Sequence, residues 1–403
     1  MWEPQTRRVR TGTGLAAGLG VTELVSWGVL VYAFGVLVVP MHDELGWSFA
    51  TLNTAYAGGM LVSGLVAVPA GWWLRRHGAR GLMVGGSVLA SAVLVAWSAV
   101  RTPAQFVLVS LFCGLAMAAT LYEPAFAVIV ERRGDPKDRA RAIVIVTGIA
   151  GFASVVFVPL TGQLSTAHGW RSALLVLAVV TLLVGAPLHA LLIRPVAHCA
   201  ATPRATVREF RSSASFRWLS VCLSGSTAMK TGFGVSVVAY LVSRGYPLRH
   251  AALVGGAAGI CQVGGRLLVS WLRLPTHLVC AAVFAGQSVA AVLLIFVADR
   301  RLGSVLLLVL ATVLLGLGYG IVELLRGTLV VDYYGRTAYP TVNARLATRV
   351  VAARTAGPLL AGWVVTATGS YLPMLLGGSA LAALSAVAML LTHRARPRNL
   401  VSG

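Results

Sequence analysis

The chain has 403 residues, of which 57% are hydrophobic and only 11% are charged, and its formal net charge is +21. That composition and a mean hydropathy of +0.82 exclude an ordinary soluble domain and indicate a membrane protein.

Apolar runs long enough to cross a bilayer recur along the whole chain, each with at least the roughly 20 residues that a spanning helix needs. The runs are too long and too continuous for the strands of a membrane barrel, so helices are predicted. Twelve spans are expected, at 13–40, 50–74, 82–100, 104–130, 142–166, 172–193, 218–243, 250–272, 278–298, 303–331, 346–367 and 371–392. The predicted fold class is therefore an all-α integral membrane protein with twelve transmembrane helices.

The first span follows three arginines, Arg7, Arg8 and Arg10, but it lacks a small-residue cleavage pattern, so a retained first helix is expected. With the N-terminus inside, most lysines and arginines outside the spans fall on the inner segments. This distribution predicts a multi-pass protein of the cytoplasmic (inner) membrane with both termini in the cytoplasm. It also accounts for the positive charge, so no nucleic-acid partner is expected.

The five cysteines show no CxxC spacing, and four of them lie inside predicted helices. They are interpreted as small packing residues. Neither a metal nor any other cofactor is expected.

A basic linker separates six spans from six. The predicted organisation is an N-terminal six-helix bundle over 1–193, a cytoplasmic linker over 194–217 and a C-terminal six-helix bundle over 218–403. The halves match locally at an offset of about 200 residues, with "FGVLV" beside "FGVSV", "LGWS" beside "RGYP", and Gly169 beside Gly369. A tandem repeat of two bundles is predicted, an arrangement that places the substrate site where the repeats meet.

The segment "GWWLRRHGARG" between spans two and three resembles the signature loop of the major facilitator superfamily. Four positions match: Gly71, Arg76, Gly78 and Arg80. Arg75 stands where the family carries an acidic residue. The stretches "HGWRSALL" and "VPLTG" add weaker similarities, and the resemblance implies the major facilitator fold over the whole chain.

Within the superfamily, the chain is most similar to bacterial relatives of the monocarboxylate transporters. The resemblance rests on "YAFGVLVVPMHDELGWS", "YEPAFAV" and "LLRGTL", and on "QVGGR", which resembles an acid-x-x-x-Arg pair of that family. Here Arg266 is retained and Gln262 replaces the acid. The resemblance implies anion binding at Arg266, whose planar guanidinium can hold a carboxylate by two hydrogen bonds.

Charged side chains inside a bilayer cost about 2.5–3.5 kcal/mol each, so they normally face a polar cavity or a partner. Away from their ends, the spans contain Glu23, Glu123, Lys230, Arg266, Glu323, Arg326 and Arg354. The third, sixth, ninth and twelfth spans contain none. The resemblance implies that the first, fourth, seventh and tenth spans line a central cavity, which agrees with most of these positions.

Each charge also has a structural interpretation. Glu323 and Arg326 share one helix face and can neutralise each other. Arg354 can extend toward the membrane surface. Glu123 precedes Pro124, which bends the helix and leaves backbone groups for the carboxylate to satisfy. Lys230 lies near the middle of its span, where it either faces the cavity or forms a permanent ion pair.

The predicted substrate site comprises Lys230, Arg266, Gln262 and Arg326, with the aromatic residues Trp27, Tyr32, Tyr122 and Tyr319. Glu23, Glu123 and Glu323 are the predicted proton-coupling residues, because burial favours the neutral form of a carboxyl.

These observations favour a monomeric secondary transporter that moves a small organic anion, coupled to protons. Proton-driven efflux of a drug or natural product stays open as an alternative. A membrane-embedded transferase is the alternative of another class, but the chain has no HExxH, GxSxG or P-loop motif.

Overall fold

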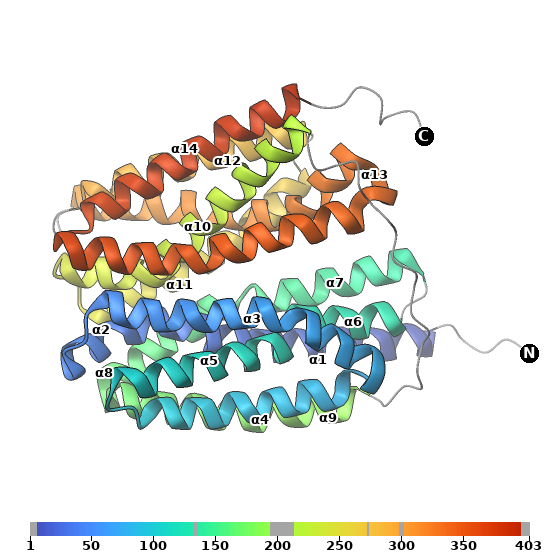
Figure 1. Ribbon diagram of the computed structural model, residues 1–403, viewed down its shortest axis with the longest axis horizontal. Helices are drawn as coiled ribbons and strands as arrows, with labels where there is room; N and C mark the ends of the chain where they lie inside the picture. Colours follow the sequence, from blue (N-terminus) through green and yellow to red (C-terminus); the bar gives the residue numbers. More distant parts are fainter. Residues whose placement is uncertain (1–5, 133–134, 194–212, 272–273, 298–301, 396–403) are drawn as a thin grey trace, which may run out of the picture. The chain divides into compact units, whose positions relative to one another are not determined.

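The computed structural model describes residues 6–132, 135–193, 213–271, 274–297 and 302–395 (Figure 1). Within these ranges the side chains of some helical residues, including Arg75, Glu323 and Arg326, lie outside the description. The described residues are helical apart from short connections and contain no strand. Among the described residues, ten stretches are long and apolar enough to cross a membrane. One of them, Arg141–Leu192, covers two of the predicted spans, and the predicted span 218–243 is not among the ten. The predicted all-helical membrane fold is therefore confirmed.

The chain forms two compact units. The first comprises Met1–Trp47 and Gly58–Ala201, and the second comprises Ser48–Ala57 and Thr202–Gly403. The second unit thus includes the start of one helix from the first half, where the backbone N–H of Ala50 donates a 2.9 Å hydrogen bond to Thr366 Oγ1. Most of the predicted linker 194–217 lies outside the described residues, so its boundaries stay a prediction.

The helices of the first unit follow the predicted spans closely. They are α1 Thr6–Trp27, η1 Gly28–Tyr32, α2 Ala33–Leu45, α3 Phe49–His77, α4 Ala79–Ser98, α5 Pro103–Thr120, α6 Tyr122–Arg132, α7 Pro136–Ala150, α8 Ala153–Val180, η2 Thr181–Gly185 and α9 Ala186–Leu192. The bend predicted at Pro124 takes the form of a break, because Leu121 is extended between α5 and α6. The fourth span is therefore two helices that meet beside Tyr122 and Glu123.

Glycines with positive φ end or interrupt the helices at equivalent places in the two halves. Gly46 and Gly245 have φ of 69° and 83°, and Gly169 and Gly369 have φ of 81° and 62°. L-residues with side chains rarely adopt such angles, which explains why glycine occurs at these positions. Both pairs are separated by about 200 residues, as the predicted repeat requires.

In addition to the start of α3, the described residues of the second unit form α10 Ala214–Ser243, α11 Leu248–Trp271, α12 Thr276–Ile295, α13 Leu302–Thr368 and α14 Leu372–Arg394. Helix α10 covers the predicted span 218–243. Helix α13 joins the predicted spans 303–331 and 346–367, because its residues stay helical between them.

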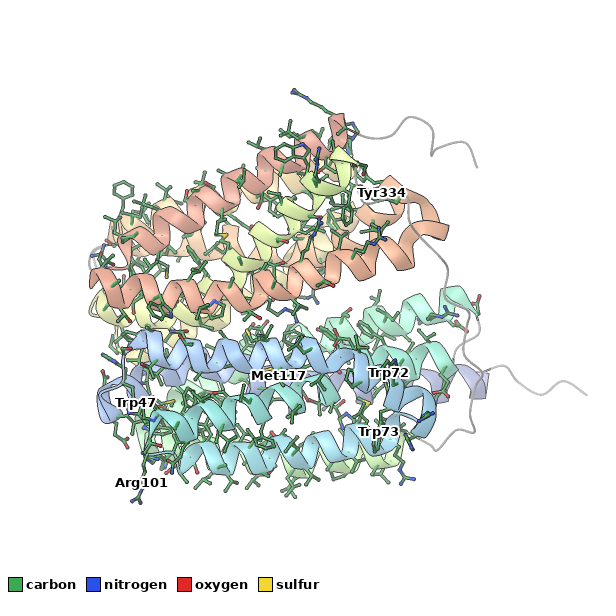
Figure 2. All side chains as sticks on the ribbon, viewed as in Figure 1. Trp47, Trp72, Trp73, Arg101, Met117 and Tyr334 are labelled. Carbon is green, nitrogen blue, oxygen red and sulfur yellow. The ribbon has the colours of Figure 1, made fainter. Side chains whose placement is uncertain are left out.

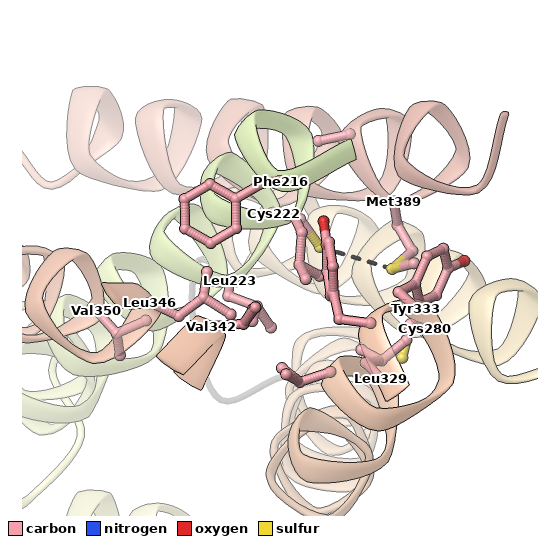
Figure 3. Packing of buried hydrophobic residues seen from close by; sticks show 14 of the residues in the cluster. Phe216, Cys222, Leu223, Cys280, Leu329, Tyr333, Val342, Leu346, Val350 and Met389 are labelled. Atoms are coloured by element: carbon pink, nitrogen blue, oxygen red, sulfur yellow. Dashed lines mark hydrogen bonds between the residues drawn. The ribbon is translucent and has the colours of Figure 1, made fainter. Parts of the chain in front are cut away.

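Helix α13 turns back on itself, as its packing shows. Leu329 and Val350 both belong to the buried cluster around Leu223 of α10 (Figure 3). A straight helix would separate these two residues of α13 by roughly 30 Å. The two arms of α13 therefore correspond to the predicted tenth and eleventh spans.

An arginine caps the C-terminal end of α4 in the first unit, and another caps that of α12 in the second. Arg171 Nη1 donates to the carbonyls of Ser98 and Val100 at 2.6 and 3.1 Å, and its Nε lies 3.0 Å from Glu44 Oε1. In the second unit, Arg244 Nη2 donates to the carbonyl of Ile295 at 3.0 Å. These bonds satisfy carbonyls that a helix end leaves unpaired. They also hold the C-terminal ends of α4 and α12 in place within their units.

Candidate functional site

The first unit gathers an aromatic cluster from three helical segments. The Trp27 ring at the end of α1 lies 5.1 Å from the ring of Tyr122 on α6 and 6.5 Å from that of Tyr32 on η1. Tyr122 in turn stacks on Phe126 at 5.1 Å. The structure therefore brings together the three aromatic residues predicted in this half.

Glu23 lies one turn before Trp27 on α1 and is fully buried. Its two carboxylate oxygens have no hydrogen-bond partner of normal geometry, although the Trp27 indole lies beside them. Glu123 is close enough to Glu23 for an electrostatic interaction, but its own side chain is exposed. A buried ionised carboxylate without hydrogen bonds is costly, so this site suits a proton or a cation.

The second unit places a cation against an aromatic face. Lys230 lies near the middle of α10, and its Nζ is 5.6 Å from the centroid of the Tyr319 ring on α13. Both side chains are half-buried. The hydroxyls of Thr227 and Thr231 donate to carbonyls within α10, so they stabilise the helix itself.

The glycines around Tyr319 allow α13 to pack closely against the neighbouring helices. In the segment "GLGYG", added Cβ atoms at Gly316 and Gly320 would collide with the backbone of α11, and one at Gly318 would meet Gln287 of α12. These glycines let α13 approach both helices closely. Tyr319 is the only large polar side chain of the segment, and it extends toward α10.

The remaining predicted residues of this half lie on α11 and α13. Gln262 is buried, and its backbone carbonyl lies against Gly320, next to Tyr319. Arg266 follows one turn later on α11 and is half-buried, as is Arg354 on the second arm of α13. The side chains of Glu323 and Arg326 lie outside the described residues, so their predicted pairing stays a prediction.

The glycines beyond Lys230 have different environments. Glycines beside a cation inside the membrane can leave space for water or substrate or let the helix bend, and Gly232 and Gly234 follow Lys230 closely. Gly232 instead lies against the backbone of Gly357 on α13, so it serves close helix packing, whereas Gly234 has open space beside its Cα.

The predicted signature loop forms the turn from α3 to α4. Gly71 lies on α3, and Gly78 makes the turn with a φ of 75°. Arg76 and Arg80 flank this turn, and both are exposed. Trp72 and Trp73 lie at the same end of α3 (Figure 2).

Sequence reasoning missed two features of the first cluster. Phe126 extends the aromatic stack, and its position four residues after Tyr122 on a helix would have identified it. The π-helical turn Gly28–Tyr32 shifts the register between Trp27 and Tyr32. Such turns often occur at functional sites, but no local sequence signal marks this one.

The described residues contain no group of three or more His, Cys, Asp and Glu side chains that could hold a metal ion. The side chains placed at these sites can bind protons at carboxyls, form ion pairs and make aromatic contacts.

Comparison with known proteins gives matches at the family and fold levels. The family described as the Major Facilitator Superfamily matches residues 19–299, well over half of the chain. No curated protein sequence matches significantly.

Two similar solved structures are crystal structures of a bacterial homologue of the human lysosomal transporter Spinster, both inward-facing. The unoccupied form has a TM-score of 0.70 at 16% identity, covering 96% of this chain and 95% of that chain. The occupied form has a TM-score of 0.69 at 16% identity, covering 98% and 97%. At this identity the likeness shows the fold alone.

Proposed function

Because the chain belongs to the Major Facilitator Superfamily, we propose that this membrane transporter moves a small organic anion by alternating access, with its flux coupled to protons. Family membership identifies a transporter rather than a membrane-embedded enzyme. The substrate class and the coupling of transport to protons are proposals.

The observation that carries the proposal is the position of Lys230. Its ammonium lies near the middle of α10, a helix that the sequence predicts to span the membrane, and against the Tyr319 ring. A cation beside an aromatic face attracts a carboxylate attached to an organic group, because the cation pairs with the charge and the ring contacts the apolar part. Arg266 and Gln262 on α11 are a second set of donors in the same unit.

The proposed proton carrier is Glu23. Its burial without hydrogen bonds means that taking up a proton removes the cost of a buried charge. Loading and unloading of that proton can therefore bias which side of the transporter is open. Glu123 and Glu323 are the alternative carriers.

The test uses the full chain reconstituted in liposomes with an imposed pH gradient and a panel of small radiolabelled monocarboxylates. We expect gradient-driven accumulation of at least one carboxylate, and its loss in Lys230→Met. Arg101→Met is the matched control, since this exposed cation lies in the turn between α4 and α5. Accumulation that persists in a well-folded Lys230→Met protein would contradict the proposal.

Proton-driven efflux of a drug or natural product is the second candidate. It is supported by the Trp27 ring, which lies beside the buried Glu23 carboxyl and contacts the Tyr122 ring, an arrangement that suits an organic cation. A thermal-shift comparison of carboxylates with lipophilic cations separates the two, because any ligand of the native state raises the melting temperature. Stabilisation by cations alone would favour efflux.

The finer assignments rest on sequence. The likeness to monocarboxylate transporters depends on the segments "YAFGVLVVPMHDELGWS", "YEPAFAV", "LLRGTL" and "QVGGR". The inner membrane location and the cytoplasmic termini depend on the distribution of basic residues. The monomeric state is also a prediction.

A further inference from the structure

We propose that the exposed stripe Leu65, Val68, Trp72 and Arg76 of α3, together with Arg80 of α4, is a binding surface for an anionic phospholipid. This surface, called the α3 stripe below, is independent of substrate transport. Its occupant is a lipid with a negatively charged headgroup, such as phosphatidylglycerol, in the leaflet next to the α3–α4 turn.

The four α3 residues lie along one line of the helix. They are spaced by three, four and four residues, which keeps their side chains on one face. Leu65 and Val68 are 66% and 60% exposed, and Trp72 is 56% exposed. This face is therefore not covered by the described part of the chain.

The order of residue types along the α3 stripe matches the profile of one lipid molecule. Leu65 and Arg76 are eleven residues apart, or about 16 Å along a helix, which is close to the thickness of one hydrocarbon leaflet. Apolar side chains at one end suit the acyl chain. Trp72 lies nearer the other end, at the depth of the membrane–water interface, where indole side chains are favoured. Arg76 then reaches the headgroup.

The charge at the headgroup end is uncompensated. Among the described residues, neither Arg76 nor Arg80 has an ion-pair partner. The sequence contains no Asp or Glu between Glu44 and Glu123. Helix α4 also begins after Gly78 with no side-chain cap, and the N-terminal end of a helix favours negative charge nearby. A phosphate is therefore the complementary group.

A second aromatic residue widens the surface. Trp73 is 48% exposed, and its ring lies 4.5 Å from that of His77 (Figure 2). The pair places a second indole and an exposed imidazole beside the α3 stripe. A zwitterionic lipid would use the indoles as well, so the arginines decide the preference for an anionic headgroup.

The test titrates the detergent-solubilised full chain with phosphatidylglycerol or phosphatidylcholine and counts bound lipids by native mass spectrometry. We expect preferential binding of phosphatidylglycerol, and a loss of affinity of about fivefold for each arginine replaced in Arg76→Gln and Arg80→Gln. The matched control is Arg101→Gln, an exposed arginine in the next interhelical turn. Thermal melting of each variant checks that it folds.

Three results would overturn the proposal: equal binding of the two lipids, equal losses in Arg101→Gln, or competition by inorganic phosphate at the same concentration as the lipid. A photo-crosslinking residue at Val68 gives a direct readout in vesicles. A covalent product with the lipid supports the α3 stripe as a lipid site, whereas a crosslink only within the chain shows that protein covers this face.

Discussion

The ammonium of Lys230 on α10 lies 5.6 Å from the centroid of the Tyr319 ring on α13. These residues are 89 positions apart in the chain, and each was selected separately from the sequence. Their contact gives the half-buried cation a fixed neighbour. The role of the ring can be tested separately from the role of the charge, because the two groups belong to different residues.

Replacement of Tyr319 by Leu removes the aromatic face and leaves Lys230 in place. A cation–π contact contributes about 0.5–2 kcal/mol, so carboxylate affinity should fall roughly 2- to 30-fold as Lys230 loses its orientation. Tyr319→Phe keeps the ring and should bind like the wild type. Calorimetric titration of the purified proteins measures both, and equal affinity in all three would show that the ring does not position Lys230.

Glu23→Gln removes the protonatable group from α1 while keeping its size. If Glu23 carries the coupled proton, this variant should lose accumulation driven by a pH gradient but retain exchange of labelled for unlabelled substrate. Liposome assays of both activities provide the measurement. Glu123→Gln tests the alternative carrier, which is exposed; loss of accumulation in that variant alone would assign the coupled proton to Glu123. Unchanged accumulation in Glu23→Gln would exclude this residue as the coupling site.

Arg266→Lys retains the positive charge on α11 but removes the planar guanidinium. If Arg266 holds the substrate carboxylate through two hydrogen bonds, affinity should fall about tenfold, because a charge-assisted bond contributes roughly 1.5–3 kcal/mol. The expected change is in substrate affinity, with the melting temperature preserved. Wild-type affinity in this variant would assign Arg266 a structural role.

Gly320→Ala tests the close approach of α13 to α11. Its new Cβ would collide with the backbone carbonyl of Gln262, and overpacking of this kind costs about 1–3 kcal/mol. A lower melting temperature is therefore expected. Gly234→Ala is the control within a neighbouring helix, since no atom lies within 4 Å of its added Cβ. Replacement there should leave stability unchanged or raise it slightly.

Arg171→Met removes the cap from the end of α4 together with the ion pair to Glu44. Two carbonyls, of Ser98 and Val100, then lose their donor, so the free energy of unfolding should fall by about 1–2 kcal/mol. Glu44→Gln should cost less than about 1 kcal/mol, because an ion pair this exposed is screened by solvent. Thermal melting of both variants measures the difference. A larger loss in Glu44→Gln would show that the ion pair, rather than the cap, holds this corner.

The sequence by itself determined the membrane class, the helical fold and most span boundaries. Spanning a bilayer requires long uncharged runs, and such runs are visible without any tertiary information. The glycines of the left-handed turns, Gly46 and Gly245, are also visible in the sequence, because a local backbone requirement selects glycine at both positions.

Only the tertiary structure decided which of the candidate residues lie together. The free-energy cost of placing a charged side chain inside the membrane identifies Glu23 and Lys230 as unusual. Their neighbours, however, depend on how the helices pack. The side of α13 that carries Tyr319 follows from contacts between segments far apart in the chain. Pro124 predicted a bend in the fourth span, but not that Leu121 would be extended and divide the span into two helices. Gly232 shows the same limit, since its contact with Gly357 arises only when α10 and the second arm of α13 are packed together. The local sequence shows which charged residues are costly in free energy inside the membrane. Helix packing determines which neighbouring residue reduces that cost.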